Sequence, residues 1–295
     1  MAVLENGIWQ NDKDISGLKN IDNFAETITP EPNRYHLYMS YACPFAHRPF
    51  LTINYMGLND IISVSSVGVV RYDKGWEFNS EYPDEINNKS YLYEIFTKHK
   101  TDYSGGVVVP VLWDKKENKV VSTDSNHIAT ELATNWKDLA KNKTNLIYGD
   151  GNEQQQLQNW LHDNINRKVY IAGFANKQDI YDKAINELFD AMAEMDNRLA
   201  NKNYLFGETI TLADFFLFAS LVRCESVYEI HFKANKKPLK QFTNLYAYLK
   251  RLITIPEIKS TINMPHLKDH YYLTHKHINP HGIVPAGPNL EWWED

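Results

Sequence analysis

A cysteine followed by a proline has the clearest chemical potential in this sequence. Cys43 and Pro44 follow a strand-like run at 35–40 and precede an apolar-periodic segment that ends at Tyr55. Proline is well tolerated at the first position of a helix, so this order predicts a strand, a turn and a helix that begins beside the cysteine. The unpaired amides and the dipole of a helix N-terminus favour a thiolate. We therefore expect a lowered pKa for Cys43 and nucleophilic chemistry at its sulfur.

The absence of a neighbouring second cysteine limits the kind of thiol chemistry. A dithiol oxidoreductase would carry a second cysteine at position 46, which is alanine here, and the other cysteine, Cys224, lies inside a predicted helix. We expect Cys224 to be a buried structural thiol. The alternative to a reactive Cys43 is that this residue, too, is a buried structural thiol. If Cys43 is reactive, an external thiol must resolve its mixed disulfide. Glutathione is the abundant candidate in a reducing compartment.

Five histidines near the C-terminus suggest a metal site as a separate hypothesis. His266 and His270 could share one face of a helix, and His275, His277 and His281 follow within a short stretch. Imidazoles at such spacings can bind zinc. No cysteine lies near them, and spacing alone does not complete a ligand set. The sequence therefore predicts no metal cofactor.

Length and composition exclude several classes of protein. A chain of 295 residues exceeds one compact domain, and its net charge of -6 argues against a nucleic-acid partner. The apolar stretch 212–222 is too short to cross a bilayer and contains Asp214. The first residues lack the basic start and apolar run of a secretory signal. Together with only two cysteines, these features predict a cytoplasmic protein with no membrane partner.

The first half of the chain alternates between strand and helix patterns. Strands are predicted at 35–40, 61–70, 107–113 and 119–121, and helices at 44–55 and 124–135. This is the order β-α-β and then β-β-α. Pro110 interrupts the third strand, where a missing N–H ends the ladder. Residues 1–33 show no strong element, and 71–106 are expected to be loop with short helical pieces.

From about residue 153 the pattern changes to long helices. Helical spacing is found over 153–164, 178–199, 214–227 and 245–252. The run Thr211-Leu212-Ala213-Asp214 has the form of a capping box. The predicted organisation is an N-terminal extension (1–33), an α/β domain (34–136), a linker (137–152), a helical domain (153–255) and a C-terminal tail (256–295).

Motifs in both halves resemble those of the glutathionyl-hydroquinone reductases, the Xi-class, omega-like glutathione transferases. In the first half these are 35–38 (YHLY), 42–48 (ACPFAHR), 75–76 (GW) and 109–114 (VPVLWD). In the second half they are 169–175 (VYIAGFA), 221–223 (LVR), 227–228 (VY), 231–233 (HFK), 270–272 (HYY), 278–280 (INP) and 282–285 (GIVP). The match runs from about residue 34 to residue 288.

The resemblance implies a fold and a reaction. The fold is an α/β thioredoxin-like N-terminal domain plus an all-α glutathione-transferase C-terminal domain, in a homodimer, with the tail packed near the active site. The reaction converts a glutathionyl-hydroquinone and glutathione to the hydroquinone and oxidised glutathione, so glutathione is the co-substrate. In this family pattern Cys43 is the nucleophile and Tyr170 donates a proton, while Tyr228 and Tyr271 assist the cysteine.

The resemblance also implies how glutathione is held. Trp76 would pack on the peptide, and Val109, ahead of a cis Pro110, would pair with its cysteinyl backbone. Asp124 and Ser125 would hold the γ-glutamyl end, helped by the N-terminus of the following helix. The full set expected to bind glutathione is Phe45, Trp76, Gly106, Val107, Val108, Val109, Pro110, Asp124 and Ser125.

Three of these residues depart from the family pattern. Phe45 stands in place of tryptophan, Gly106 in place of arginine and Asp124 in place of glutamate. Two other functions stay open. One is an omega-like thioltransferase or dehydroascorbate reductase, and the other is a non-catalytic protein that holds aromatic ligands in a transferase-like fold. An intact Cys43 argues against the second, because holding a ligand needs no thiolate.

Overall fold

The chain passes from one folding unit to another after residue 143. The two units comprise residues 1–143 and 144–295. The structure is a computed structural model that describes residues 3–11, 16, 18 and 21–293. Parts of the predicted N-terminal extension and the last two residues of the predicted tail lie outside this described range. The finer division into five parts stays a prediction.

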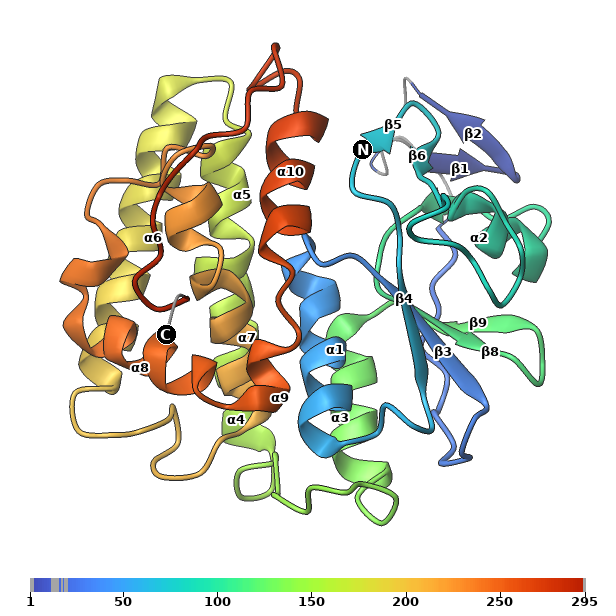
Figure 1. The fold of residues 1–295 in the computed structure, drawn as a ribbon, viewed down its shortest axis with the longest axis horizontal. Coiled ribbons are helices and arrows are strands. Elements are labelled where there is room, and N and C mark those ends of the chain that lie inside the picture. The colour runs from blue at the N-terminus through green and yellow to red at the C-terminus, as the bar shows by residue number, and fades with distance from the viewer. Residues whose placement is uncertain (1–2, 12–15, 17, 19–20, 294–295) are drawn as a thin grey trace. The chain divides into compact units, whose positions relative to one another are not determined.

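A mixed four-stranded sheet forms the centre of the first unit (Figure 1). Its strand order is β4 (Ser63–Ser66), β3 (Tyr35–Met39), β8 (Val111–Asp114) and β9 (Lys119–Ser122). β3 and β4 are parallel and joined by α1 (Pro44–Met56), whereas β8 pairs antiparallel with β3 and with β9. α1 and α3 (Ser125–Asn135) lie side by side on one face, and α2 (Tyr93–His99) lies on the other. The predicted β-α-β, β-β-α order of a thioredoxin-like domain is confirmed.

The N-terminal residues contain strands that the sequence pattern did not indicate. β1 (Val3–Glu5) pairs with β2 (Ile8–Gln10) and with β7 (Gly105–Gly106), about a hundred residues away. The expectation of no element over 1–33 was therefore wrong, because such short strands depend on a distant partner. β5 (Arg71–Tyr72) and β6 (Gly75–Trp76) form a further small hairpin.

Two predicted strands were too long. The strand expected at 107–113 begins only at Val111, because the preceding Pro110 has no N–H to donate and its peptide bond with Val109 is cis. The strand expected at 61–70 is limited to Ser63–Ser66, the residues that pair with β3. The cis bond itself was expected from the resemblance and is confirmed.

The second unit is helical in the part of the chain that the structure describes. Its α-helices are α4 (Asn152–Leu161), α5 (Lys168–Gly173), α6 (Gln178–Arg198), α7 (Leu212–Leu221), α8 (Thr243–Ile253), α9 (Pro256–Lys259) and α10 (Met264–Thr274). Two π-helical segments, η2 (His162–Asn166) and η3 (Cys224–Tyr228), follow α4 and α7, and η4 (Leu239–Gln241) is a 3-10 turn. The single helices predicted at 153–164 and 214–227 each change to π geometry near their ends. Such segments are frequent at functional sites.

α7 is buried on every side within this unit. All ten of its residues are buried. The predicted capping box is present: Oδ2 of Asp214 accepts hydrogen bonds from the amide and the hydroxyl of Thr211 at 2.7 and 2.8 Å. Oδ1 of the same carboxylate accepts from the Leu205 amide and the Tyr248 hydroxyl, each at 2.9 Å. Asp214 therefore also holds a loop and a neighbouring helix.

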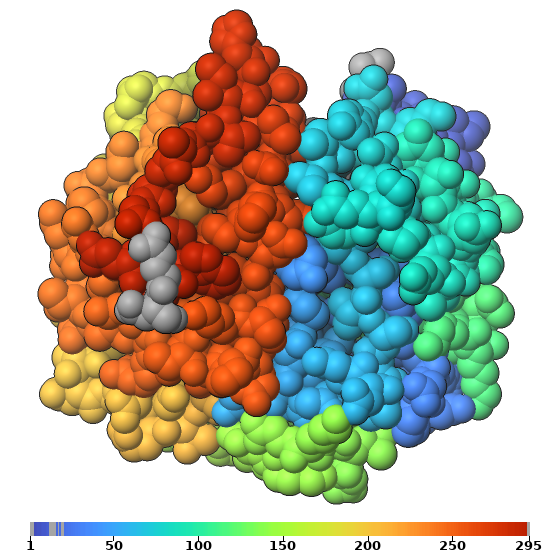
Figure 2. Space-filling view, viewed as in Figure 1, coloured from blue at the N-terminus to red at the C-terminus, as the bar shows by residue number. Residues whose placement is uncertain are grey.

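The C-terminal residues form a helix and then an extended tail. α10 begins at an N-cap, Asn263, whose side chain accepts from the His266 amide at 3.0 Å. The tail after it lies on the surface of the second unit, dark red in Figure 2. Lys268 holds the tail by donating to the Pro285 carbonyl at 2.8 Å, and the Trp292 indole donates to Glu225 at 2.6 Å. Among the described residues, no helix has both the length and the apolar character needed to span a membrane.

His36 joins two strands of the first unit from a buried position. Its ring nitrogens lie 2.8 Å from the hydroxyl oxygens of Ser63 and Ser65 on the parallel strand β4. The ring is 3% exposed, and burial lowers its pKa from 6.5 to about 4. The folded protein therefore holds this ring in its neutral form at pH values where an unfolded chain already binds a proton.

We predict that this histidine makes the protein less stable in mild acid. Because the pKa is lowered on folding, the unfolded chain takes up a proton between pH 6.5 and about 4 that the folded chain does not. The free energy of unfolding should fall across this window by about 1.4 kcal/mol per pH unit from this residue. Urea unfolding of the wild type and of His36→Gln at several pH values measures the difference. Equal slopes for the two proteins would contradict the prediction.

Candidate active site

Cys43 caps the N-terminus of α1. Its backbone is extended (φ -80°, ψ 116°), Pro44 occupies the first helical turn, and the Cys43 amide donates to the Ser40 carbonyl at 3.0 Å. The Ala46 amide donates to the Cys43 sulfur at 3.5 Å. The side chain is neither buried nor fully exposed. The sequence prediction of a cysteine at a helix N-terminus is confirmed.

A carbonyl also approaches this sulfur. Cys43 Sγ lies 3.6 Å from the Val109 carbonyl oxygen, with the thiol as donor. The Ala46 amide stabilises the thiolate, whereas a carbonyl acceptor stabilises the neutral thiol. The position of Val109 follows from the cis bond to Pro110, which turns the chain just before β8. The sulfur thus lies between the Ala46 amide, which favours the thiolate, and the Val109 carbonyl, which favours the neutral thiol.

A buried arginine links two residues predicted to bind glutathione. Arg48, only 2% exposed, donates from Nη1 to the Ser125 hydroxyl at 3.2 Å. Its guanidinium lies 4.9 Å from the centre of the Phe45 ring. Phe45 on α1 and Ser125 on α3 are therefore fixed relative to each other. Sequence reasoning quoted Arg48 within a motif but gave it no role, although a charged residue on a helix full of apolar neighbours was a usable signal.

Asp124 caps α3 with its own carboxylate. The side chain is exposed, and Oδ1 accepts from the amides of Asn126 and His127 at 2.8 and 3.1 Å. The sequence suggested that this helix N-terminus helps bind the carboxylate of glutathione. Two of its amides are already occupied by Asp124, so they are not free for that task. Asp124 itself remains in place as an exposed anionic group.

The other predicted glutathione contacts lie in the loop before β8 and in the hairpin. Val107 and Val109 are buried, whereas Val108 is half-buried. Gly106 is paired with β1, and its carbonyl accepts from the Tyr103 hydroxyl at 3.0 Å. Trp76 in β6 is 6% exposed. Among them, the carbonyl of Val109 approaches the Cys43 sulfur.

The three predicted tyrosines come together within the second unit. Tyr170 lies on α5, Tyr228 ends η3, and Tyr271 lies on α10. The Tyr170 and Tyr271 hydroxyl oxygens are 2.5 Å apart. The Tyr228 ring centre lies 6.1 Å from each of the other two. Three residues distant in sequence therefore form one cluster, hereafter the tyrosine cluster.

Exposure differs among the three tyrosine residues. Tyr228 and Tyr271 are each 2% exposed, whereas Tyr170 is half-buried. Burial raises the pKa of Tyr228 well above 10, so its hydroxyl stays protonated. Tyr170 is thus the least buried residue of the cluster.

Both π-helical segments adjoin this cluster, and Asn166 connects the first of them to the helix that precedes the second. Asn166, fully buried at the end of η2, donates to the Ser220 hydroxyl at 2.6 Å and to the Phe216 carbonyl at 3.0 Å. These acceptors lie on α7, just before η3. Tyr170 follows η2, and Tyr228 ends η3. The Asn166 hydrogen bonds therefore connect the segment before Tyr170 to the helix before η3.

The histidines near the C-terminus pack with aromatic rings. His231 Nε2 and His275 Nδ1 are hydrogen-bonded at 3.1 Å, and His270 Nδ1 lies 3.3 Å from the Thr274 hydroxyl. Burial lowers the pKa of His231 to about 4. Within the described residues, no group of three or more His, Cys, Asp or Glu side chains is placed to hold a metal ion.

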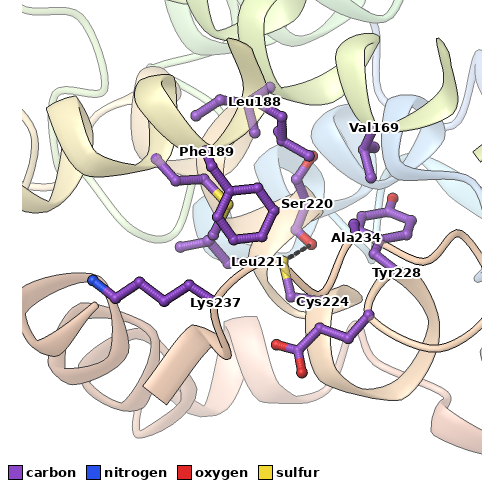
Figure 3. Close-up of a pocket in the computed structure, with 12 residues that line it drawn as sticks. Val169, Leu188, Phe189, Ser220, Leu221, Cys224, Tyr228, Ala234 and Lys237 are labelled. Carbon is purple, nitrogen blue, oxygen red and sulfur yellow. Dashed lines mark hydrogen bonds between the residues drawn. The ribbon is translucent and has the colours of Figure 1, made fainter. Parts of the chain in front are cut away.

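Cys224 has the surroundings of a structural thiol. It is 9% exposed, and its sulfur donates to the Ser220 carbonyl at 3.5 Å. Burial raises its pKa well above 9. It borders a small cavity of about 20 Å³, lined largely by apolar side chains such as Val169, Leu188 and Phe189 (Figure 3). Tyr228 also lines this cavity, so the cavity adjoins the tyrosine cluster.

Comparison with known proteins identifies the same family from both units of the chain. The model for the glutathione S-transferase N-terminal domain matches residues 42–135, and that for the C-terminal domain matches residues 178–251. The glutathionyl-hydroquinone reductase YqjG of Escherichia coli is 38% identical, over 90% of this chain and 81% of the relative. The glutathionyl-hydroquinone reductase PcpF of Sphingobium chlorophenolicum is 33% identical, over 98% of this chain and 96% of the relative.

Solved structures agree with these relatives. A Xi-class transferase from Natrialba magadii superimposes with a TM-score of 0.95 at 37% identity, covering 99% of this chain and 95% of that one. The glutathione-bound structure of YqjG from Escherichia coli gives a TM-score of 0.90 at 33% identity, covering 99% and 97%. The resemblance drawn from the sequence motifs is confirmed. This chain belongs to the glutathionyl-hydroquinone reductase family, the Xi class of the glutathione S-transferases.

Proposed function

We propose that this protein reduces glutathionyl-hydroquinones with glutathione, through a mixed disulfide on Cys43. The observation that carries the proposal is the half-buried sulfur at the N-terminus of α1, with the Ala46 amide directed at it. The other cysteine, Cys224, is buried in the second unit. A lone reactive thiol needs an external thiol to complete its cycle, and glutathione supplies it.

The cycle has two balanced steps. In the first, the Cys43 thiolate attacks the glutathionyl sulfur of the conjugate. The S–S bond forms, the carbon–sulfur bond breaks, and the aryl carbon keeps the electron pair and takes a proton to become the hydroquinone. In the second, a glutathione thiolate attacks the mixed disulfide, which releases oxidised glutathione and regenerates the Cys43 thiolate. The aromatic carbon is reduced from C–S to C–H, and the thioether sulfur of the conjugate and one glutathione thiol become the disulfide of oxidised glutathione.

We assign proton delivery in the first step to the tyrosine cluster. Tyr170 is its least buried member, and its hydroxyl is hydrogen-bonded to that of Tyr271. Such a bond can stabilise the tyrosinate left after Tyr170 gives up its proton. Tyr228 supplies a buried ring and a hydroxyl that stays protonated.

Glutathione binding is assigned to the loop around Val109 and to the start of α3. The Cys43 thiol donates to the Val109 carbonyl at 3.6 Å, and this hydrogen bond is lost once the thiol ionises. The main chain of Val109 can then pair with the cysteinyl backbone of glutathione. Within the described residues, the hydrogen bonds to the Asp124 carboxylate are made to Oδ1, which leaves Oδ2 for a ligand. This exposed carboxylate suits the γ-glutamyl ammonium group. Homodimer formation belongs to the same proposal, and light scattering on the purified protein tests it.

Replacement of the two cysteines separates the reactive thiol from the structural one. Cys43→Ser should lower the rate of glutathionyl-hydroquinone reduction by at least about 10³-fold, because a hydroxyl does not form the mixed disulfide. Cys224→Ala should retain activity, because that thiol is buried and its pKa is raised. Mass spectrometry after incubation with the conjugate should find one glutathione adduct, on Cys43, that free glutathione removes.

Retained activity in Cys43→Ser, or an adduct on another residue, would overturn the mechanism. A substrate panel addresses the second candidate. If the wild-type protein reduces simple glutathione mixed disulfides or dehydroascorbate faster than aromatic conjugates, it is an omega-like thioltransferase instead. If Cys43 forms no adduct with any of these substrates, the protein is a binding protein for aromatic ligands.

Loss of the Tyr170 hydroxyl should impair the aromatic substrate selectively. Tyr170→Phe is expected to reduce kcat for a glutathionyl-hydroquinone by about 10²-fold, within the usual range for general-acid catalysis. Reduction of a glutathione mixed disulfide should be little changed, because no carbon atom needs a proton there. Tyr148→Phe, at an exposed tyrosine stacked on Phe206, is the control. Equal losses on both substrates would contradict the assigned role.

A further inference from the structure

Phe232 lies at the centre of the tyrosine cluster. It follows η3 by four residues and is fully buried. Its ring centre lies 5.3 Å from that of Tyr170, 5.6 Å from that of Tyr228 and 5.7 Å from that of Tyr271. By comparison, the ring centre of Tyr228 lies 6.1 Å from that of Tyr170 and 6.1 Å from that of Tyr271. The three tyrosines therefore pack around Phe232 more closely than around one another.

The orientation of this ring differs toward each tyrosine. It is nearly parallel to Tyr228, at 4°, and lies edge-on to Tyr170 and Tyr271, at 66° and 82°. Stacked and edge-to-face arrangements are both favourable for aromatic pairs and depend on geometry. A side chain of similar volume without a flat ring would not hold all three neighbours in these positions.

Gly173 brings the ring against the backbone of α5. A Cβ atom at this position would lie 2.2 Å from Cγ of Phe232 and 2.4 Å from Cδ1. Such distances do not occur between real atoms, so any side chain at position 173 must displace the ring. Gly173 is the last residue of α5, the helix that carries Tyr170 three residues earlier. The glycine thus sets how closely Phe232 approaches the backbone that positions the Tyr170 hydroxyl.

We propose that Phe232, seated on Gly173, is a positioning residue for the tyrosine cluster. It sets the spacing of the three rings and thereby keeps the Tyr170 and Tyr271 hydroxyl oxygens within 2.5 Å of each other. The proposal rests on the proposed function, because the cluster is taken to deliver the proton to the aromatic product. Phe232 touches no reacting atom in this account. Its effect on catalysis passes through the position of Tyr170.

Two substitutions and their combination test the proposal by kinetics. Gly173→Ala and Phe232→Leu should each lower kcat for a glutathionyl-hydroquinone by about 10- to 100-fold, the size expected for displacement of a catalytic group by about 1 Å. KM for glutathione and the rate on a glutathione mixed disulfide should change little. The double variant should be no worse than Phe232→Leu alone, because a smaller side chain leaves room for the alanine methyl. In a Tyr170→Phe background, Gly173→Ala should cause no further loss.

A matched variant distinguishes positioning from general packing. Phe242 is also buried, at 2% exposure, but its ring packs on Phe189 and Lys237. Phe242→Leu should lower thermal stability in the manner of Phe232→Leu while leaving kcat within about twofold. If Phe242→Leu reduces kcat as much as Phe232→Leu, or if Gly173→Ala leaves kcat unchanged, the proposal is overturned.

A spectroscopic measurement keeps the proposal testable if the reaction assignment fails. With tyrosine labelled at Cζ, the resonances of Tyr170 and Tyr271 report the state of their hydroxyl groups. Both resonances should shift in Gly173→Ala and stay in place in Phe242→Leu. Unshifted resonances in Gly173→Ala overturn the positioning role whatever the substrate. Inactivity of the wild type on glutathionyl-hydroquinones, together with the expected shifts, would overturn the proposed function and leave the positioning role supported.

Discussion

The hydrogen bond from the Ala46 amide to the Cys43 sulfur is the contact on which the proposed chemistry depends. A thiol becomes a good nucleophile only when it ionises, and the N-terminus of α1 supplies unpaired amides for the resulting charge. The preceding strand and Pro44 place the sulfur there by local geometry alone. The Val109 carbonyl opposes ionisation until a ligand takes it over. In the proposed reaction, glutathione binding and activation of the thiol are therefore coupled at one backbone group.

In the proposed reaction, the second unit contributes hydroxyl groups rather than a nucleophile. Its tyrosine cluster is assembled from α5, η3 and α10, and none of these elements could hold the three rings alone. Aromatic packing around Phe232 and the hydrogen bonds from Asn166 to α7 connect the elements of this unit. Burial keeps Tyr228 protonated, whereas Tyr170, the proposed proton donor, is half-buried. Differences in burial thus give similar residues different tasks.

The sequence predicts those parts of the fold that local chemistry determines. The strand before Cys43, the helix after it and the capping box at Thr211 follow from residues adjacent in the chain, and the structure contains all three. Family motifs identified the tyrosines, but their 2.5 Å contact joins positions 101 residues apart and has no local signal. The pairing of β1 with β7 is equally distant. The Arg48–Ser125 hydrogen bond and the close approach of Phe232 to Gly173 depend on tertiary packing, which no local pattern specifies.

The pH dependence of Cys43 alkylation tests the central claim most directly. In a Cys224→Ala protein, the rate of reaction with iodoacetamide reports the thiolate form of Cys43 alone. The account predicts a midpoint at least about one pH unit below the value of about 8.5 for an unperturbed cysteine, because the helix N-terminus stabilises the charge. A midpoint at or above that value would contradict it.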